Sequence, residues 1–348
     1  MTLAKKLMLA AACLTVVVAG AFTANAAIIV KSADITTDET WTNDNVLDRP
    51  VFVVSGATLT IEPGTLIRGE KEVANDPGAL VISRGSKIRA MGTCDQPIVM
   101  TNMDDDHYVG PTPAPGTGKW AQPNNGVSRT WGGLLLLGKA YIATKVGEPG
   151  TPSPNGSLEL QVEGLEPYGN NSLYGGPNDL DDSGELHYVS LRYGGFVLGE
   201  SNEINGVTFG AVGRETEVDH IEVFQNKDDG FEFFGSTVNT KYMMAWNVAD
   251  DAFDWDEGYR GKGQFWFCMQ GVHTDEGDVS DKGAEMDGAN GDGSLPSSCP
   301  TIFNATYVGH GVDVDRQKNL ALHFRDGTAG RYFNSLFLDY AGAAALIE

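Results

Sequence analysis

A phrase of about 22 residues occurs twice in succession and constrains the fold more than any other feature of this chain. The residues that superimpose are Ile221 and Met243, Val223 and Ala245, Asp228-Asp229 and Asp250-Asp251, Phe231 and Phe253, Glu232 and Asp254, and Phe233 and Trp255. A further shift backward places Phe209 and Ala211 on Phe231 and Phe233. Repeats with a period in the low twenties are typical of solenoids, in which each coil stacks on the next.

The residue pattern inside the repeat is that of β-strands. Side chains alternate across a strand, so Phe231 and Phe233 share one face and Glu232 takes the other. Short β-branched and aromatic runs are cut by turn residues throughout the chain, which has 44 glycines, and long amphipathic helical patterns are absent. We therefore predict an all-β solenoid. Its inner column comprises Phe209, Phe231 and Phe253, and its outer column comprises Glu232, Asp254 and Asp256.

Residues 1–26 have the pattern of a secretory signal peptide. Lys5 and Lys6 precede an apolar run, and Ala24-Asn25-Ala26 provides a small-residue cleavage site. We predict that residues 27–348 form a single β-helix domain. Its loop excursions are expected at Asp104–Thr130, Gly147–Ser157 and Asp275–Cys299, which are rich in Pro, Gly, Asn or acids. The terminal "YAGAAALIE" has no polar cap, so either the chain is truncated at its C-terminus or another element covers the last coil.

The charge of the chain excludes some partners and favours others. A formal net charge of −23 repels nucleic acid and anionic lipid but suits divalent cations. No segment after the signal peptide has the roughly 18–20 apolar residues of a membrane span. We expect a protein that is secreted to the cell surface, the extracellular space or the periplasm. Of Cys94, Cys268 and Cys299, the last two are the favoured disulfide pair, although an odd number leaves the pairing open.

Several segments resemble those of secreted bacterial proteins with right-handed parallel β-helix repeats. The segments are "GATLTIEPGTLIRGE" (56–70), "ALVISRGSKIRAMGT" (79–93), "WGGLLLLGKA" (131–140), "YGGPNDLDDSGELHYVSLRYGG" (174–195), "EINGVTFGAVG" (203–213) and "DDGFEFFGSTVNTKYMMAW" (228–246). More remotely, the coils are similar to the pectate-lyase-like superfamily, which includes calcium-dependent polysaccharide lyases, glycosidases and adhesins. The resemblance implies a right-handed parallel β-helix, but fold alone does not determine function.

Acidic residues concentrate at the repeat, with fifteen acids against four basic residues between Asp228 and Asp292. In a β-helix, carboxylates one coil apart would lie about 4.8 Å from each other. At that distance they repel by several kcal/mol at an effective dielectric near 20. We predict that calcium relieves this repulsion. The predicted ligands are Asp228, Asp229, Glu232, Asp250, Asp251, Asp254 and Asp256. The alternative is that the Asp-Asp pairs are only turn formers and that solvent screens their charge.

Catalytic residues are only weakly indicated, and whether the chain is an enzyme stays open. A polysaccharide lyase would need a Lys or Arg base, for which Lys227, Lys241, Arg260 and Lys262 are available. Aspartates beside a cation favour its charged form, so structural ion pairs are the expected role of all four. Glu232 and Asp254 could instead form the carboxyl pair of a glycoside hydrolase.

The sequence thus predicts a calcium-stabilised β-helix protein that binds polysaccharide or a cell-surface glycan, or has a structural or adhesive role there. A calcium-dependent polysaccharide lyase or glycoside hydrolase is the main alternative. A self-assembling surface or filament protein is a third. The oligomeric state is left open.

Overall fold

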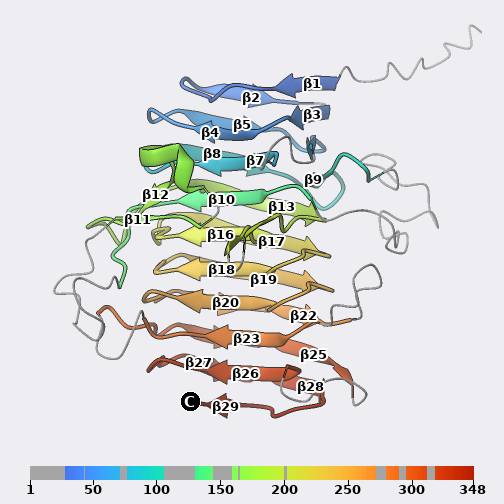
Figure 1. Ribbon diagram of the computed structural model, residues 1–348, viewed down its shortest axis with the longest axis vertical. Helices are drawn as coiled ribbons and strands as arrows, with labels where there is room; N and C mark the ends of the chain where they lie inside the picture. Colours follow the sequence, from blue (N-terminus) through green and yellow to red (C-terminus); the bar gives the residue numbers. More distant parts are fainter. Residues whose placement is uncertain are drawn as a thin grey trace, which may run out of the picture.

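The chain winds into one stack of coils, from residue 28 at one end to residue 348 at the other (Figure 1). The computed structural model describes residues 28–42, 44–70, 77–105, 130–143, 159–163, 165–199, 202–271, 280–289, 295–311 and 318–348. The predicted signal peptide and the excursion at Gly147–Ser157 lie outside the described residues. So do most of the excursion at Asp104–Thr130 and residues 275–279 and 290–294 of the third excursion.

Two large parallel sheets run the length of the stack. The nine-stranded sheet, here called sheet B, comprises β4 (Pro50–Val53), β7 (Ala79–Ile82), β10 (Gly133–Leu137), β16 (Val207–Gly210), β18 (Phe231–Phe234), β20 (Phe253–Asp256), β23 (Lys282–Met286), β26 (Leu320–Phe324) and β29 (Leu346–Ile347). Each of these strands pairs in parallel with the strand of the next coil.

The sixteen-stranded sheet, sheet A, bends into two legs. The first leg contains β2 (Glu39–Trp41), β5 (Thr58–Ile61), β8 (Lys87–Met91), β21 (Lys262–Gln264), β24 (Thr301–Phe303) and β27 (Arg331–Phe333). The second leg contains β1 (Ile28–Lys31), β3 (Asp44–Leu47), β6 (Leu66–Gly69), β9 (Ile98–Asn102), β22 (Phe267–Met269), β25 (Thr306–Gly311) and β28 (Leu336–Tyr340). Three longer strands, β13 (Gly184–Arg192), β17 (Glu217–Phe224) and β19 (Asn239–Trp246), pass through both legs.

One residue per coil forms the corner between the two legs. Tyr188, His220, Tyr242 and Phe265 all have φ between 50° and 60°, a left-handed conformation that turns the strand sharply. Their rings stack outside the coil, with centroids 4.2, 4.4 and 5.0 Å apart from one pair to the next. Asn304 and Asn334 take the same place in the last two coils. Each coil therefore has three faces: sheet B and the two legs of sheet A.

Two small elements complete the described chain. Antiparallel pairs are formed by β11 (Leu160–Gln161) with β12 (Leu173–Tyr174), and by β14 (Val197–Gly199) with β15 (Asn202–Glu203). The only helix in the described part is a 3₁₀ segment, η1 (Glu166–Ser172). No helix found there has the length and apolar character needed to cross a membrane. The three cysteines Cys94, Cys268 and Cys299 are free thiols, so the disulfide favoured from the sequence is not formed.

Stacked aromatic rings occupy part of the core between the sheets, beside many aliphatic side chains. Phe231 lies opposite Phe253, and Phe233 lies opposite Trp255, as the 22-residue repeat predicts. All four are fully buried, and the rings of Phe231 and Phe253 stack with centroids 5.3 Å apart. This arrangement confirms the parallel β-helix.

The preceding coil corrects the predicted register. Phe209 lies opposite Phe233, not Phe231, and the two rings stack 4.9 Å apart. The turn between β16 and β17 has two more residues than the turn between β18 and β19, so this coil is 24 residues long. Because two residues preserve the alternation of faces, Phe209 still points inward.

The terminal coil leaves apolar side chains exposed. Phe333, Leu336 and Leu338 are 47–58% accessible, and they lie on β27 and β28, which pair with a neighbour on one side only.

Candidate functional site

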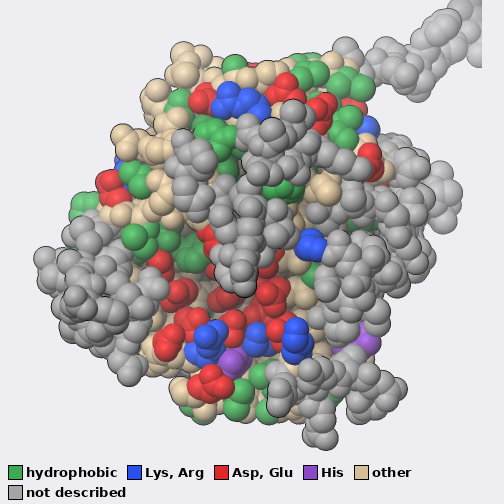
Figure 2. Space-filling model, viewed as in Figure 1, with side chains coloured by type: hydrophobic (Ala, Val, Ile, Leu, Met, Phe, Trp, Pro, Cys, Tyr) green, Lys and Arg blue, Asp and Glu red, His purple; other side chains and the backbone are tan. Residues whose placement is uncertain are grey.

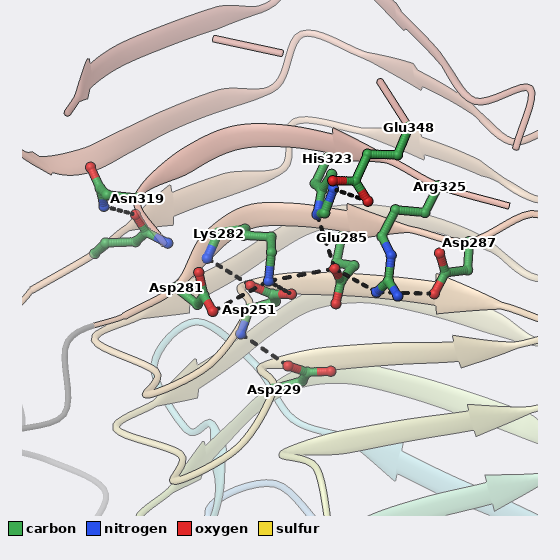
Figure 3. Close-up of polar contacts among 11 residues, drawn as sticks. Asp229, Asp251, Asp281, Lys282, Glu285, Asp287, Asn319, His323, Arg325 and Glu348 are labelled. Carbon is green, nitrogen blue, oxygen red and sulfur yellow. Dashed lines mark hydrogen bonds and ion pairs between the residues drawn. The ribbon is translucent and has the colours of Figure 1, made fainter. Parts of the chain in front are cut away.

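Two aspartates link three successive coils where each coil enters sheet B. Asp229 lies just before β18 and Asp251 just before β20, and both are buried. The Asp229 Oδ1 atom accepts a hydrogen bond from the Asp251 N–H at 2.9 Å (Figure 3). The Asp251 Oδ1 atom accepts one from the Lys282 N–H at 2.6 Å. Each carboxylate thus satisfies a backbone donor of the next coil, which gives the repeated aspartate a structural role.

A second column of acids stands on the outer face of sheet B. Glu232 of β18 lies opposite Asp254 of β20, which in turn lies opposite Glu285 of β23. The predicted alternation is confirmed, since these side chains face away from the aromatic core. Glu232 is nevertheless only 8% exposed, so this outer surface is partly shielded from solvent.

Carboxylates of adjacent coils converge into four groups whose oxygen atoms lie within 4.8 Å of one another. The groups are Asp228-Asp229-Asp250, Asp229-Glu232-Asp254, Asp250-Asp251-Asp281 and Asp251-Asp254-Glu285. We call these eight residues the acidic face, and Figure 2 shows acidic side chains gathered on this side of the molecule. The structure thus brings together six of the seven predicted metal ligands. Asp256 belongs to none of the groups found in the described chain, and its Oδ1 atom accepts the Glu257 N–H at 2.5 Å.

Burial and mutual repulsion raise the pKa values of these carboxyl groups. The pKa values of Asp229, Glu232 and Asp254 lie well above the usual range, first because burial disfavours the charged form and then because neighbouring carboxylates repel it. Burial also raises the pKa of Asp251, although Lys282 opposes that shift. Without a cation, these four carboxyl groups therefore favour the protonated form more than free carboxyl groups do.

Basic residues neutralise one end of the acidic face (Figure 3). The Lys282 Nζ atom lies 3.4 Å from Asp251, 3.3 Å from Asp281 and 3.5 Å from Glu285. The Arg325 guanidinium contacts Glu285 at 2.8 Å. Burial alone would raise the pKa of Glu285, but Lys282 and Arg325 lower it overall. Neither Lys282 nor Arg325 forms an ion pair with Asp229, Glu232 or Asp254 among the described residues.

Two buried oxygen atoms near this group have no hydrogen-bond partner among the described residues. They are Oδ1 of Asp254 and Oδ1 of Asn205. Asn205 is 2% exposed, and its side-chain amide donates to the Glu232 carboxylate. A constant 22-residue period does not align Asn205 with Asp229, so the repeat as first read gives no sign of Asn205. A shift of 24 would have aligned Asn205-Gly206 with Asp229-Gly230.

The predicted catalytic cations do not lie on the acidic face as free bases. The Arg260 guanidinium pairs with Asp179 at 2.7 Å, beyond the end of β20, which confirms its expected ion pair. Burial lowers its pKa, and Asp179 opposes this shift, so the expected direction is wrong for Arg260. Lys227 lies in the turn before β18, where its backbone N–H donates to Gly194 at 3.0 Å.

Lys241 and Lys262 depart from the prediction most clearly. Both lie on the first leg of sheet A, on a different face from the acids. Neither has an ion-pair partner in the described part of the chain, whereas the sequence predicted salt bridges for both.

The fold and the acidic face define a parallel β-helix protein with a carboxylate cluster on one sheet. The chain matches the family model described as "Pectate-lyase like beta helix domain" over residues 31–112 and 117–348, and it belongs to that family. No curated protein and no solved structure matches the chain.

Proposed function

We propose that this protein binds calcium on the acidic face and uses the bound ion to hold an acidic polysaccharide outside the cell. The observation that carries the proposal is the Asp229-Glu232-Asp254 group, in which three carboxyl groups with raised pKa values meet. Its Asp254 Oδ1 atom and the neighbouring Asn205 Oδ1 atom are buried and have no hydrogen-bond partner among the described residues. Calcium takes six to eight oxygen ligands, and such a donor set of carboxylate and amide oxygens suits it. The coordination positions of the calcium ion that the protein does not fill could take carboxylates or hydroxyls of a sugar.

Membership in a pectate-lyase-like family supports a polysaccharide as the ligand. The charge of the acidic face makes a metal necessary for this ligand, because an acidic glycan and eight acidic side chains repel each other. The predicted export of the chain places such a protein where cell-surface and matrix glycans occur.

A binding role fits the ion pairs better than a lyase reaction does. A lyase base must lose its proton, and Lys282 is held by three carboxylates that raise its pKa above the usual range in spite of burial. Arg325 is held by Glu285, and its pKa is raised for the same reason.

Glycoside hydrolysis is the second candidate, because one observation favours it. Glu232 and Asp254 face each other on adjacent strands, and both have pKa values raised by burial. A carboxyl group that stays protonated near neutral pH can serve as a general acid. The hydrolase would release new reducing ends from a polysaccharide, which a binding protein does not do.

Calorimetry with calcium and a panel of acidic polysaccharides, polygalacturonate first, tests the proposal. We expect calcium to bind and to increase the affinity for glycan. Asp254→Asn combined with Glu232→Gln should remove calcium binding and the calcium-dependent gain in glycan affinity, while the exposed control Asp95→Asn should retain both. Binding of glycan with equal affinity in saturating chelator would overturn the proposal. Assays for reducing ends and for unsaturated products on the same samples distinguish binding from hydrolysis and lysis.

A further inference from the structure

A groove of about 680 Å³ lies on the first leg of sheet A, away from the acidic face. It crosses β17, β19 and β21 and ends at Phe303 of β24. Its charged lining residues are Arg214, Glu217, Asp219, Lys241 and Lys262. The groove thus carries three basic residues and two acids on a chain whose net charge is −23, and the Arg214 guanidinium lies 3.9 Å from Asp179.

Both acids of the groove lie near histidines, whereas its two lysines have no ion-pair partner in the part of the chain that the structure describes. Asp219 contacts His187 at 3.0 Å and His220 at 2.7 Å, and Glu217 lies 3.9 Å from His187. Lys241 and Lys262 are exposed and have no ion-pair partner among the described residues. Their ammonium groups are therefore available to an anion from solution.

A second groove on the same leg shows that pairing is the usual arrangement there. It is lined by β2, β5, β8 and the start of β13. Its basic residues Lys87 and Arg89 form ion pairs with Asp182 and Glu185. Two grooves on one sheet thus differ in whether their cations are already neutralised.

The remaining lining of the first groove determines which anion fits. The strands beneath it pair with neighbours on both sides, so no free edge is available for a peptide to extend the sheet. Recognition must come from side chains. Asn239 and Gln264 offer amides, and the Phe303 ring, 39% exposed, offers an apolar surface. Amides that bind hydroxyls, ammonium groups that bind anionic substituents and an aromatic ring together suit an acidic sugar better than a peptide.

We propose that this groove binds an acidic oligosaccharide, through Lys241 and Lys262, without a metal ion. The groove shares a ligand class with the proposed function, but it uses a different face and opposite charges. Its ligand spans adjacent coils, because Lys241 lies on β19 and Lys262 on β21. An anionic substituent of the sugar, carboxylate or sulfate, contacts each ammonium group.

The test is a binding titration of the full chain in saturating chelator, which disables any calcium-dependent site. The probes are a carboxylated, a sulfated and a neutral oligosaccharide of equal length. We expect one or both acidic probes to bind and the neutral probe not to bind. Raising the salt concentration should weaken the binding, because the contacts are charged and exposed.

The variant Lys241→Gln with Lys262→Gln should lose at least tenfold in affinity and keep the melting temperature of the parent. The matched control is Lys87→Gln with Arg89→Gln in the second groove, which should bind as the parent does. Equal binding by the parent and the Lys241/Lys262 variant would overturn the proposal, as would equal binding of the neutral probe or no binding in chelator.

The two proposals fail separately. Binding that requires calcium, and that Asp254→Asn removes while the lysine variant retains it, would refute the groove and leave the acidic face intact. Chelator-resistant binding that only the lysine variant loses supports the groove even if the acidic face binds no metal.

Discussion

The same coil carries opposite charges on two of its faces. On sheet B, Glu232 lies opposite Asp254, so a repeat of like residues produces a column of like charges. On the first leg of sheet A, Lys241 lies between Asp219 and Gln264, because the sequence there differs from coil to coil. Repetition in register is favourable for the inner rings, which stack, but costly for outer carboxylates, which repel. An acid that repeats from coil to coil therefore requires a counter-charge. Where the residues at one position differ from coil to coil, as on the first leg, lysines do not need one.

The largest expected difference in stability is between two variants that each remove one lysine, one from each face. Lys282→Met should lower the free energy of unfolding by about 3 kcal/mol, because it leaves Asp251 and Glu285 without their ammonium partner. The matched change Lys262→Met, at an exposed lysine with no ion pair to any residue that the structure describes, should stay within about 0.5 kcal/mol. Urea unfolding without metal measures both. Equal losses in the two variants would show that the two faces do not differ as described.

Calcium should stabilise the protein through the acidic face alone. A calcium concentration one hundred times its Kd adds about 2.7 kcal/mol to the free energy of unfolding. Replacing Asp228, Asp229, Asp250 and Asp251 together by Asn should abolish this gain, while asparagine oxygens still accept the N–H groups of Asp251 and Lys282. Thermal unfolding with calcium and with chelator is the measurement. If this variant still gains stability from calcium, the ion binds elsewhere. If the parent protein gains none, the proposed calcium site is wrong.

The pH dependence of stability should reflect the raised pKa values of the acidic face. A carboxyl group whose pKa is higher in the folded state binds more protons there, so the metal-free protein gains stability as the pH falls. The gain in stability accumulates as the pH falls from the raised pKa of the folded state to the ordinary carboxyl pKa near 4. For the neighbouring Asp287, burial raises the pKa to about 7. Each such group contributes up to about 1.4 kcal/mol per pH unit.

Asp254→Asn removes one of these groups and should make the slope of stability against pH shallower. Saturating calcium should also flatten the slope in the parent protein, because the ion favours the charged carboxylates. Urea unfolding from pH 4 to 8 checks both. If stability without metal increases with pH over this range, the raised pKa values are wrong.

The smallest expected difference in stability is between lysine substitutions in the two grooves on the first leg. Lys87→Met breaks an exposed ion pair with Asp182 and should cost no more than about 1 kcal/mol. Lys262→Met has no pair to break and should cost less still. A double-mutant cycle of Lys87 with Asp182 gives the pair energy directly, and Lys262 with Glu217 serves as the reference. If the coupling energy of Lys262 with Glu217 were larger than that of Lys87 with Asp182, the two grooves would not differ in ion pairing as described.

Much of the fold could be read from local pattern. The alternation in 231–233 and 253–255 predicts which side chains enter the core, and the repeated Asp-Asp turns predict that carboxylates meet between coils. The register of the preceding coil was missed because turn length, not strand pattern, sets it. The aligned Asn205-Gly206 and Asp229-Gly230 carry the signal that was overlooked, since Gly206 and Gly230 lie where an added Cβ would collide with the next coil. Ion pairing was harder to predict, because the partner of Arg260 is 81 residues away.

The sequence by itself determined the strand periodicity, the coil repeat, the inward aromatic column and the excess of acid on one outer column. These follow from the alternation of side chains along a strand and from spacing within a few tens of residues. Only the tertiary structure decided which coil contacts which, that Lys282 neutralises one end of the acids, and that Lys241 and Lys262 lie on another surface with no ion-pair partner among the described residues. Such outcomes depend on the lengths of turns and on contacts between distant segments, which no local pattern encodes.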